Sequence, residues 1–283
     1  MEIMKFIGDL VKFFIKGFIV MFLIVVGLMV LFDDTSDTGT ANLVEIKLSG
    51  AIMDESAVLK EIYKAHDDTN IKGVLLNIDS PGGALSPSVE ISNAIKELNS
   101  IKPVVAYASG MMTSGSYLAG INARKIYANE GSFIGSIGVI IQGVNIEELS
   151  QKIGFKEQTV SAGEYKQAGT MMREWSEKER ESLQELVDKS YDLFTSKVAI
   201  ARNLSLDKKD EWANARVFLA SDALNLGLID GISSYRDAKF EVIKLSNVSE
   251  PIWREKSKYD MFIDSLSTKL GNLILSEMGL KVR

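Results

Sequence analysis

Two short, uninterrupted apolar runs constrain the fold of this chain more than any other feature. They are Gly73–Ile78 (GVLLNI) and Pro103–Ala108 (PVVAYA). Runs of this kind are typical of strands buried on both faces, because a strand with one face in water alternates apolar and polar residues. Between them the sequence predicts a helix with Ser86 as N-cap, Pro87 at its first position and an end near Leu98. Strand, helix, strand in this order predicts an α/β domain with a largely parallel sheet and flanking helices.

Similar signals continue on both sides of this unit. Further strands are predicted at Leu43–Leu48, Lys125–Ala128, Gly138–Ile141 and the start of Gly154–Gly169, and further helices at Glu55–His66 and Ser114–Ala123. A capping box formed by Ser176 and Glu179 opens a long helix. Its apolar stripe contains Leu183, Leu186, Val187, Tyr191, Phe194 and Val198.

An apolar segment near the N-terminus predicts a membrane anchor. Gly17–Phe32 contains no charged residue, and its sixteen residues would reach roughly 24 Å as a helix. The preceding turn and snorkelling lysines extend that length toward the ~30 Å hydrocarbon core. Lysines precede the run and aspartates follow it, so the N-terminus is expected in the cytoplasm and the main domain outside it. A cleaved signal peptide is the alternative, but no small-residue cleavage site directly follows Phe32. We therefore favour a retained single-pass anchor in the cell membrane.

These signals divide the chain into four predicted parts. A cytoplasmic N-terminus and transmembrane helix occupy residues 1–32, and a polar linker occupies residues 33–41. The main domain follows over residues 42–245, and an amphipathic helical extension occupies residues 246–283. The apolar face of this extension could pack on its own domain, on a partner subunit or on the membrane.

Residue usage excludes several kinds of chemistry. The chain has no cysteine, which removes disulfides, thiolate metal sites and thiol nucleophiles. Its single histidine, His66, stands beside Asp67 and Asp68 and is expected to be a solvated surface residue. We expect no metal site, because zinc would have to be held almost wholly by carboxylates. The net charge of −6 offers no basic surface for nucleic acid.

Two glycine-containing turns could carry acyl-transfer chemistry. Ser80-Pro81-Gly82-Gly83 follows one buried strand, and Ser114-Gly115 opens a predicted helix after the next one. Main-chain N–H groups of glycines can approach an oxyanion closely, and Ser114 is placed as a nucleophile between strand and helix. An ordinary Pro-Gly turn and an N-cap serine are the structural alternatives for the two segments.

A serine nucleophile needs a base, and the histidine count narrows the choice. With His66 expected on the surface, lysine is the remaining common partner for serine. A lysine base must lower its pKa from ~10.4 toward 7 or 8, which requires burial without a carboxylate partner. Residue patterns alone leave open which lysine this is.

Four segments, in this order, resemble the signal peptide peptidase A family over roughly Leu43–Ser234. They are Asp79-Ser80-Pro81-Gly82-Gly83, Ala108-Ser109-Gly110 through Thr113-Ser114-Gly115-Ser116-Tyr117, Gly135-Ser136-Ile137-Gly138-Val139, and Ser161-Ala162-Gly163-Glu164-Tyr165-Lys166. That family is a Ser-Lys branch of the Clp-protease and crotonase-like folds. One departure is Ser116, which stands where the family often has a second glycine. The departure puts the shape of the neighbouring pocket in question.

The resemblance implies roles for five residues. Ser114 would be the nucleophile, Lys166 its base, Ser136 the residue that orients the lysine amine, and Gly83 and Gly115 the oxyanion donors. It implies a membrane-anchored serine endopeptidase that acts through an acyl-enzyme, without a cofactor, on remnant signal peptides or other membrane-proximal polypeptides. A ring-shaped homo-oligomer is expected as well. The alternatives are a catalytically degenerate membrane scaffold and a crotonase-like acyl-CoA enzyme.

Overall fold

The computed structural model describes residues 16–23, 27 and 40–255, and the chain separates into two units. The first unit comprises Met1–Thr40 and Arg254–Arg283, and the second comprises Ala41–Trp253. In the first unit, residues 16–23 are helical. Across the residues that the structure describes, no helix is both long and apolar enough to cross a membrane. Three predicted parts lie largely outside the described residues and stay predictions: the anchor after residue 23, the linker over 33–39 and the C-terminal apolar face.

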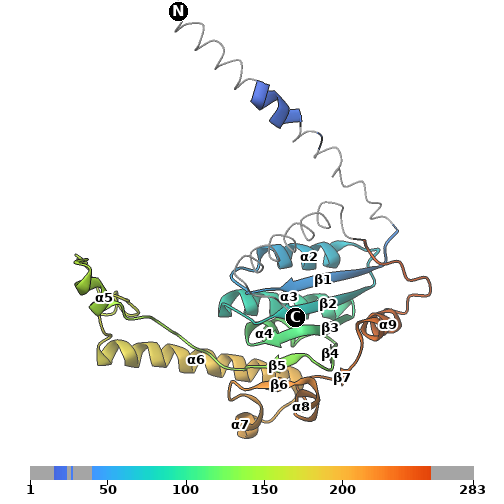
Figure 1. The fold of residues 1–283 in the computed structure, drawn as a ribbon. Helices are drawn as coiled ribbons and strands as arrows, with labels where there is room; N and C mark the ends of the chain where they lie inside the picture. Colours follow the sequence, from blue (N-terminus) through green and yellow to red (C-terminus); the bar gives the residue numbers. More distant parts are fainter. Residues whose placement is uncertain (1–15, 24–26, 28–39, 256–283) are drawn as a thin grey trace, which may run out of the picture. The chain divides into compact units, whose positions relative to one another are not determined.

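Within residues 40–255, the second unit contains a seven-stranded sheet (Figure 1). The strands are β1 (Leu43–Ser49), β2 (Gly73–Ser80), β3 (Val104–Thr113), β4 (Lys125–Ala128), β5 (Phe133–Gly135), β6 (Val217–Leu219) and β7 (Gly231–Ile232). Their main order is β1-β2-β3-β4-β7, and every pair is parallel except β5 with β6. The predicted α/β domain with a largely parallel sheet is confirmed.

Helices cover both faces of this sheet. The helical segments of this unit are α2 (Ser56–Asp67), α3 (Leu85–Ile101), α4 (Gly115–Gly120), α5 (Glu147–Lys152), α6 (Glu177–Arg202), a short 3₁₀ turn η1 (Leu206–Lys208), α7 (Lys209–Trp212), α8 (Ala220–Asn225) and α9 (Tyr235–Ser246), and not all of them contact the sheet. Alternate strand residues point to opposite faces. Leu76 and Ala106 therefore join the large core that includes residues of α2, α3, α4 and α6. Leu75 and Val105 join a smaller core beneath α9.

The structure extends the main domain slightly beyond the predicted residues 42–245. Residues up to Trp253 belong to the compact unit. The N–H of Leu43 donates to the carbonyl of Ile252 over 3.1 Å, and Leu43 also forms a bridge with Trp253. The segment after α9 therefore adds to the edge of the sheet beside β1.

Two predicted strands and one predicted cap are wrong. Residues 138–141 and 154–160, all of them described, contain no strand. The strand forms earlier, as β5, because β3 runs past the end of β4 and offers its second half as a free edge there. The N-cap of α3 is Ala84 rather than Ser86. The N–H of Ala84 is held by the carbonyl of Ile52, and this bond fixes the entry to the helix two residues earlier than the sequence indicates.

The segment 138–176, which we call the arm, leaves the sheet after β5, carries α5 and leads back into α6 (Figure 1). The predicted capping box at the start of α6 is confirmed, because Ser176 and Glu179 exchange both hydrogen bonds. The apolar residues of α6 that enter the main core, Phe194 and Val198 among them, lie in its C-terminal half. The N-terminal half of α6 instead meets the arm, where Arg173 pairs with Glu179 over 2.7 Å.

We expect the junction between the arm and α6 to loosen in acid. The pKa of Glu179 lies at about 2, below its ordinary value of 4.5, chiefly because Arg173 donates hydrogen bonds to the carboxylate. A depressed folded-state pKa stabilises the fold above the unfolded pKa, and that contribution is lost as the pH falls from about 4.5 toward 2. Hydrogen exchange at the N–H of Ile146, which bonds the carbonyl of Met171 within the arm, measures this loosening.

Glu179→Gln is the matched variant for this measurement. It removes the titrating group, so arm exchange should become nearly independent of pH between 5 and 3 once the intrinsic exchange rate is divided out. Amides of β2 serve as the internal control, because they report global rather than local opening. Arm protection that stays constant in the natural chain down to pH 2 would contradict the prediction.

Candidate active site

Ser114 lies at the sharp turn between β3 and α4. Its backbone has φ 53° and ψ −125°, a conformation that residues other than glycine rarely adopt. Such strain between a strand and a helix is the geometry that exposes a nucleophilic serine. The N–H of Ser114 donates to the carbonyl of Gly135 over 2.7 Å and holds the turn in place. The side chain is partly exposed and makes no capping hydrogen bond with α4, so it does not serve as a helix cap.

Gly83 and Gly115, the two predicted oxyanion donors, lie next to each other. A Cβ placed on Gly115 would stand 3.1 Å from the nitrogen of Gly83. A Cβ placed on Gly82 would stand 2.6 Å from the nitrogen of Gly115 and 2.8 Å from Cβ of Ser114. Gly82 also has φ +95°. Only a residue without a side chain allows the two turns to approach this closely.

The N–H groups of both glycines are left outside the local backbone pairing. Gly83 forms an isolated parallel bridge with Ile52. The two hydrogen bonds of this bridge use the residues on either side of Gly83: the N–H of Ile52 donates to the carbonyl of Gly82, and the N–H of Ala84 donates to the carbonyl of Ile52. Gly115 opens α4, and the first N–H groups of a helix have no acceptor within it. Two adjacent N–H donors beside a serine hydroxyl can stabilise an oxyanion.

A β-bulge precedes the nucleophile turn. Ile78 pairs with Ala108, but Ser80 pairs with Met112, so two steps along β2 face four steps along β3. The extra length bends β3 locally and carries its last residues away from regular pairing. The bulge therefore helps to set the direction in which the chain reaches Ser114.

The carboxylate of Asp79 holds this bulge. Its Oδ1 accepts the N–H of Met111 over 2.9 Å. A Cβ on Gly110 would stand 2.4 Å from the same oxygen, so the contact requires glycine there. Asp79 belongs to a sequence segment that the family resemblance singled out, yet sequence reasoning assigned it no role. The structure gives it the role of fixing β3 three residues before Ser114.

We expect Asp79→Ala to lower both stability and activity. The variant leaves the N–H of Met111 without its charged acceptor, a loss of about 1 kcal/mol of unfolding free energy at this exposed position. Asp79→Asn keeps an acceptor oxygen in the same place and should retain most of the stability. Denaturant unfolding and hydrolysis rates measured on both variants test the prediction, which fails if alanine and asparagine behave alike.

The sheet also places Ser136 beside the nucleophile turn. Thr113 and Gly135 are a parallel pair on β3 and β5, so Ser114 and Ser136 are the residues that directly follow two neighbouring strands. Ser136 has φ 49°, and its N–H donates to the carbonyl of Arg216 over 2.7 Å. Its side chain is partly exposed. Four of the five predicted site residues therefore come together at one end of β3 and β5.

The fifth residue, Lys166, is not brought to Ser114 in this chain. It is exposed, in a turn of the arm, whereas the sequence argument required a buried base. It lines a surface hollow of about 600 Å³ whose walls come wholly from residues 157–170 of the arm. The neighbouring Glu164 binds Lys178 in the first turn of α6 over 2.7 Å, and this pair ties the turn to the helix.

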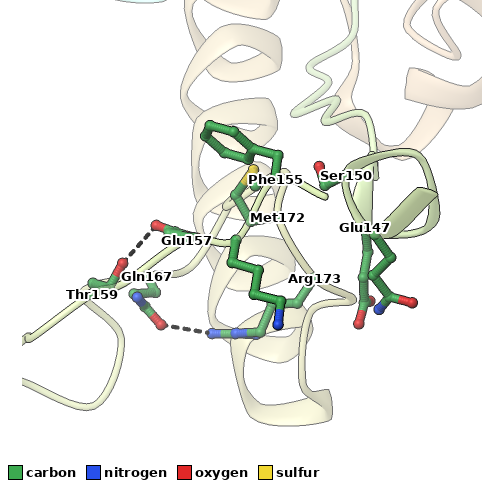
Figure 2. Close-up of a pocket in the computed structure, with 10 residues that line it drawn as sticks. Glu147, Ser150, Phe155, Glu157, Thr159, Gln167, Met172 and Arg173 are labelled. Atoms are coloured by element: carbon green, nitrogen blue, oxygen red, sulfur yellow. Dashed lines mark hydrogen bonds between the residues drawn. The ribbon is translucent and has the colours of Figure 1, made fainter. Parts of the chain in front are cut away.

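Another hollow of about 300 Å³ lies within the arm and is also separate from Ser114 (Figure 2). Figure 2 shows Arg173 reaching toward Gln167, 3.4 Å away. The same guanidinium makes the bidentate bond with Glu179, so its charge is used to hold the arm on α6. Arg173 therefore has a structural role at this hollow.

His66 takes no part in the site. It lies on α2, where its Nδ1 stands 2.8 Å from a carboxylate oxygen of Asp67 and its Nε2 3.8 Å from one of Glu97. The ring is partly rather than fully exposed. Its partners are carboxylates on the surface, which agrees with the expectation that the single histidine is not the base.

The side chain of Tyr117 anchors α4 under the site. It is fully buried, and its hydroxyl donates to the carbonyl of Leu228 over 2.7 Å. Burial raises the pKa of Tyr117 above its ordinary value, so the group stays neutral and keeps its proton for this bond. The nucleophile turn therefore rests on a helix that is tied to a distant part of the chain.

Comparison with known proteins fits this geometry. Residues 96–249, just over half of the chain, match the model of peptidase family S49. A putative protease of Synechocystis sp. is 37% identical over 199 residues, which cover 70% of this chain and 72% of that protein. A putative signal peptide peptidase SppA of Enterococcus faecium is 32% identical over 248 residues, 87% of this chain and 70% of that protein. The chloroplastic serine protease SPPA of Arabidopsis thaliana is 33% identical over 184 residues, which cover 65% of this chain and 27% of that protein.

The chain belongs to peptidase family S49, within the signal peptide peptidase A family. It is therefore a peptidase, and the acyl-CoA alternative has no support among these relatives. Among solved structures, ClpP1 of Listeria monocytogenes matches with a TM-score of 0.49 and 15% identity, over 69% of this chain and 93% of that one.

Proposed function

We propose that this peptidase is a serine endopeptidase with Ser114 as its nucleophile and Lys166 as its base. The observation that carries the proposal is the strained turn at Ser114. Its hydroxyl makes no capping hydrogen bond with α4, and the turn lies beside the N–H groups of Gly83 and Gly115. A positive φ at a serine costs free energy, and active sites are where such strain is commonly retained.

The proposed reaction uses each residue at a stated step. Lys166, as the neutral amine, takes the proton of the Ser114 hydroxyl while Oγ forms a bond to the scissile carbonyl carbon. The N–H groups of Gly83 and Gly115 stabilise the oxyanion that results, and losing one such donor typically costs ~3 kcal/mol. The C–N bond then breaks as Lys166 gives the proton to the leaving amine, and water hydrolyses the acyl-enzyme by the same route. Ser136 would orient the lysine amine.

We further propose that Lys166 reaches Ser114 only when copies of the chain assemble. The turn that carries Lys166 is tied to Lys178 on α6. Lys178 comes sixteen positions before Phe194, which belongs to the main core, and sixteen helical residues span about 24 Å. Large apolar side chains are exposed on the arm, among them Ile140, Val144, Leu149, Ile153, Phe155 and Val160. An exposed apolar surface of this kind is typical of an interface. A neighbouring copy would cover it and place its own Ser114 beside the lysine.

The proposed setting is a membrane. The uncharged run Gly17–Phe32 would anchor the chain with its N-terminus in the cytoplasm and the peptidase domain outside it. Substrates held in or near the same membrane would meet the enzyme at a raised local concentration. Remnant signal peptides fit that description, and a relative in Enterococcus faecium carries the name signal peptide peptidase.

A fluorophosphonate probe tests the nucleophile directly. It should modify the full-length protein at Ser114, located by peptide mass spectrometry, and should not modify Ser114→Ala. Because the proposed site needs assembly, the labelling is run on the intact oligomer and again after dilution to the monomer, where it should fall. Folded, assembled protein that takes up no label at Ser114 would overturn the proposal and favour a degenerate scaffold.

A further inference from the structure

Ser116 is a fully buried residue two positions after the nucleophile, and its hydroxyl makes three contacts with the backbone. The hydroxyl oxygen accepts the N–H of Thr113 over 2.9 Å. It also stands 2.7 Å from the carbonyl of Ser80 and 2.8 Å from the carbonyl of Thr113. A hydroxyl has one proton, which goes to one carbonyl at a time. The oxygen therefore joins the end of β2 to the end of β3.

These contacts lie at the last point where β2 and β3 are paired. The pair Ser80 and Met112 is the final one between the two strands. Pro81 follows Ser80 and has no N–H, so in this last pair the carbonyl of Ser80 faces the N–H of Thr113. The Ser116 hydroxyl bonds to both of these groups and so bridges the two strand ends.

The two proposed oxyanion donors lie on the two segments that follow the ends of β2 and β3 and diverge from this point. Gly83 follows Ser80 by three residues, and Gly115 follows Thr113 by two. The spacing between their N–H groups therefore depends on how the ends of β2 and β3 are held together. Misplacing a catalytic group by about 1 Å can lower a rate about 100-fold.

We propose that Ser116 is a positioning residue for the oxyanion site, and that its hydroxyl fixes the distance between the turn carrying Gly83 and the turn carrying Ser114 and Gly115. The inference rests on the proposed serine peptidase reaction. It gives a role to the serine at position 116, where the family resemblance leads one to expect glycine: its side-chain oxygen bonds to both strand ends.

A matched control separates this role from ordinary core packing. Ser132 is likewise buried, and its hydroxyl donates to the carbonyl of Ala108 on β3 over 2.8 Å. It bonds neither Ser80 nor the nucleophile turn. Ser116→Ala and Ser132→Ala thus delete the same atom at nearly equal burial, and Ser116→Ala should lower the melting temperature more, because its hydroxyl has three backbone contacts and that of Ser132 has one.

The test measures kcat, KM and the rate of fluorophosphonate labelling for the full chain and both variants. Ser116→Ala should lower kcat and the labelling rate by about tenfold or more, with KM within about twofold of the natural chain. The pH profile of kcat should keep its midpoint, because Ser116 does not titrate. Ser132→Ala should stay within about twofold of the natural chain in kcat.

Each outcome decides the matter. Equal losses of kcat in the two variants, or a Ser116→Ala enzyme within about twofold of the natural chain, would overturn the positioning role. If Ser116→Ala does not fold, Ser116→Gly takes its place, because glycine leaves room for a bridging water, and the same kcat comparison applies. A natural chain that is itself unlabelled at Ser114 would overturn the peptidase proposal and the positioning role together, whereas labelling with unaffected variants overturns only the second.

Discussion

Replacing Ser114 with alanine is expected to lower kcat for peptide hydrolysis by about 10⁴-fold or more while the protein remains folded and assembled. The reason is that the chain offers no second nucleophile at the turn. Thr113 and Ser116 are both fully or almost fully buried, and the Ser116 hydroxyl is committed to backbone groups. Cleavage of a fluorogenic peptide, followed alongside circular dichroism and the oligomeric state, measures the effect.

A second substitution, Ser114→Gly, separates the loss of the nucleophile from the backbone strain at this position. Alanine at φ 53° keeps an unfavourable backbone conformation, whereas Ser114→Gly relieves it, so the glycine variant should be the more stable of the two inactive proteins. Ser109→Ala is the matched control: Ser109 is an exposed serine on the same strand, and its hydroxyl bonds Asn77 outside the turn. A Ser114→Ala enzyme that kept more than about a tenth of the natural rate would show that the nucleophile lies elsewhere.

The parts of the fold that the sequence predicted well are those in which the signal is local. The runs in β2 and β3 are apolar on both faces, and Gly73 marks the start of β2 in both prediction and structure. The capping box of Ser176 and Glu179 is complete within four residues. Each of these features is decided by neighbours in the chain, so no tertiary information was needed.

The wrong predictions share a different cause. The position of β5 depends on the length of β3, which offers Met111–Thr113 as an edge beyond the end of β4. The start of α3 depends on Ile52, more than thirty residues earlier in the chain, because its carbonyl holds the N–H of Ala84. Pairing partners distant in sequence decide such boundaries, and no residue pattern near Gly138 or Ser86 records them.

The site divides in the same way. Ser114, Gly83 and Gly115 could be proposed from the sequence because glycine-bearing turns that follow neighbouring parallel strands meet at one edge of a sheet. Asp79, Ile52 and the bond from Ser116 to Ser80 were missed because their roles are contacts between segments that lie far apart in the chain. The burial expected of a lysine base was not found within one chain, which is why assembly enters the proposal.

Replacing Lys166 with alanine should lower kcat by about 10³-fold or more, because the Ser114 hydroxyl would then have no amine to accept its proton. Fluorophosphonate labelling should slow by a similar factor. Lys156→Ala serves as the control, since Lys156 is another exposed lysine on the arm. A Lys166→Ala enzyme with near-natural activity would require a different base.

The decisive form of this experiment mixes two inactive proteins. If the dyad forms between copies, oligomers assembled from equal amounts of Ser114→Ala and Lys166→Ala contain sites that take an intact serine from one subunit and an intact lysine from its neighbour. Random assembly makes such sites about a quarter of the total, so activity should return to about a quarter of the natural value. A dyad formed within one chain gives no recovery, because every chain then carries one damaged partner. The exposed turn of Lys166 and the exposed apolar side chains of the arm favour recovery.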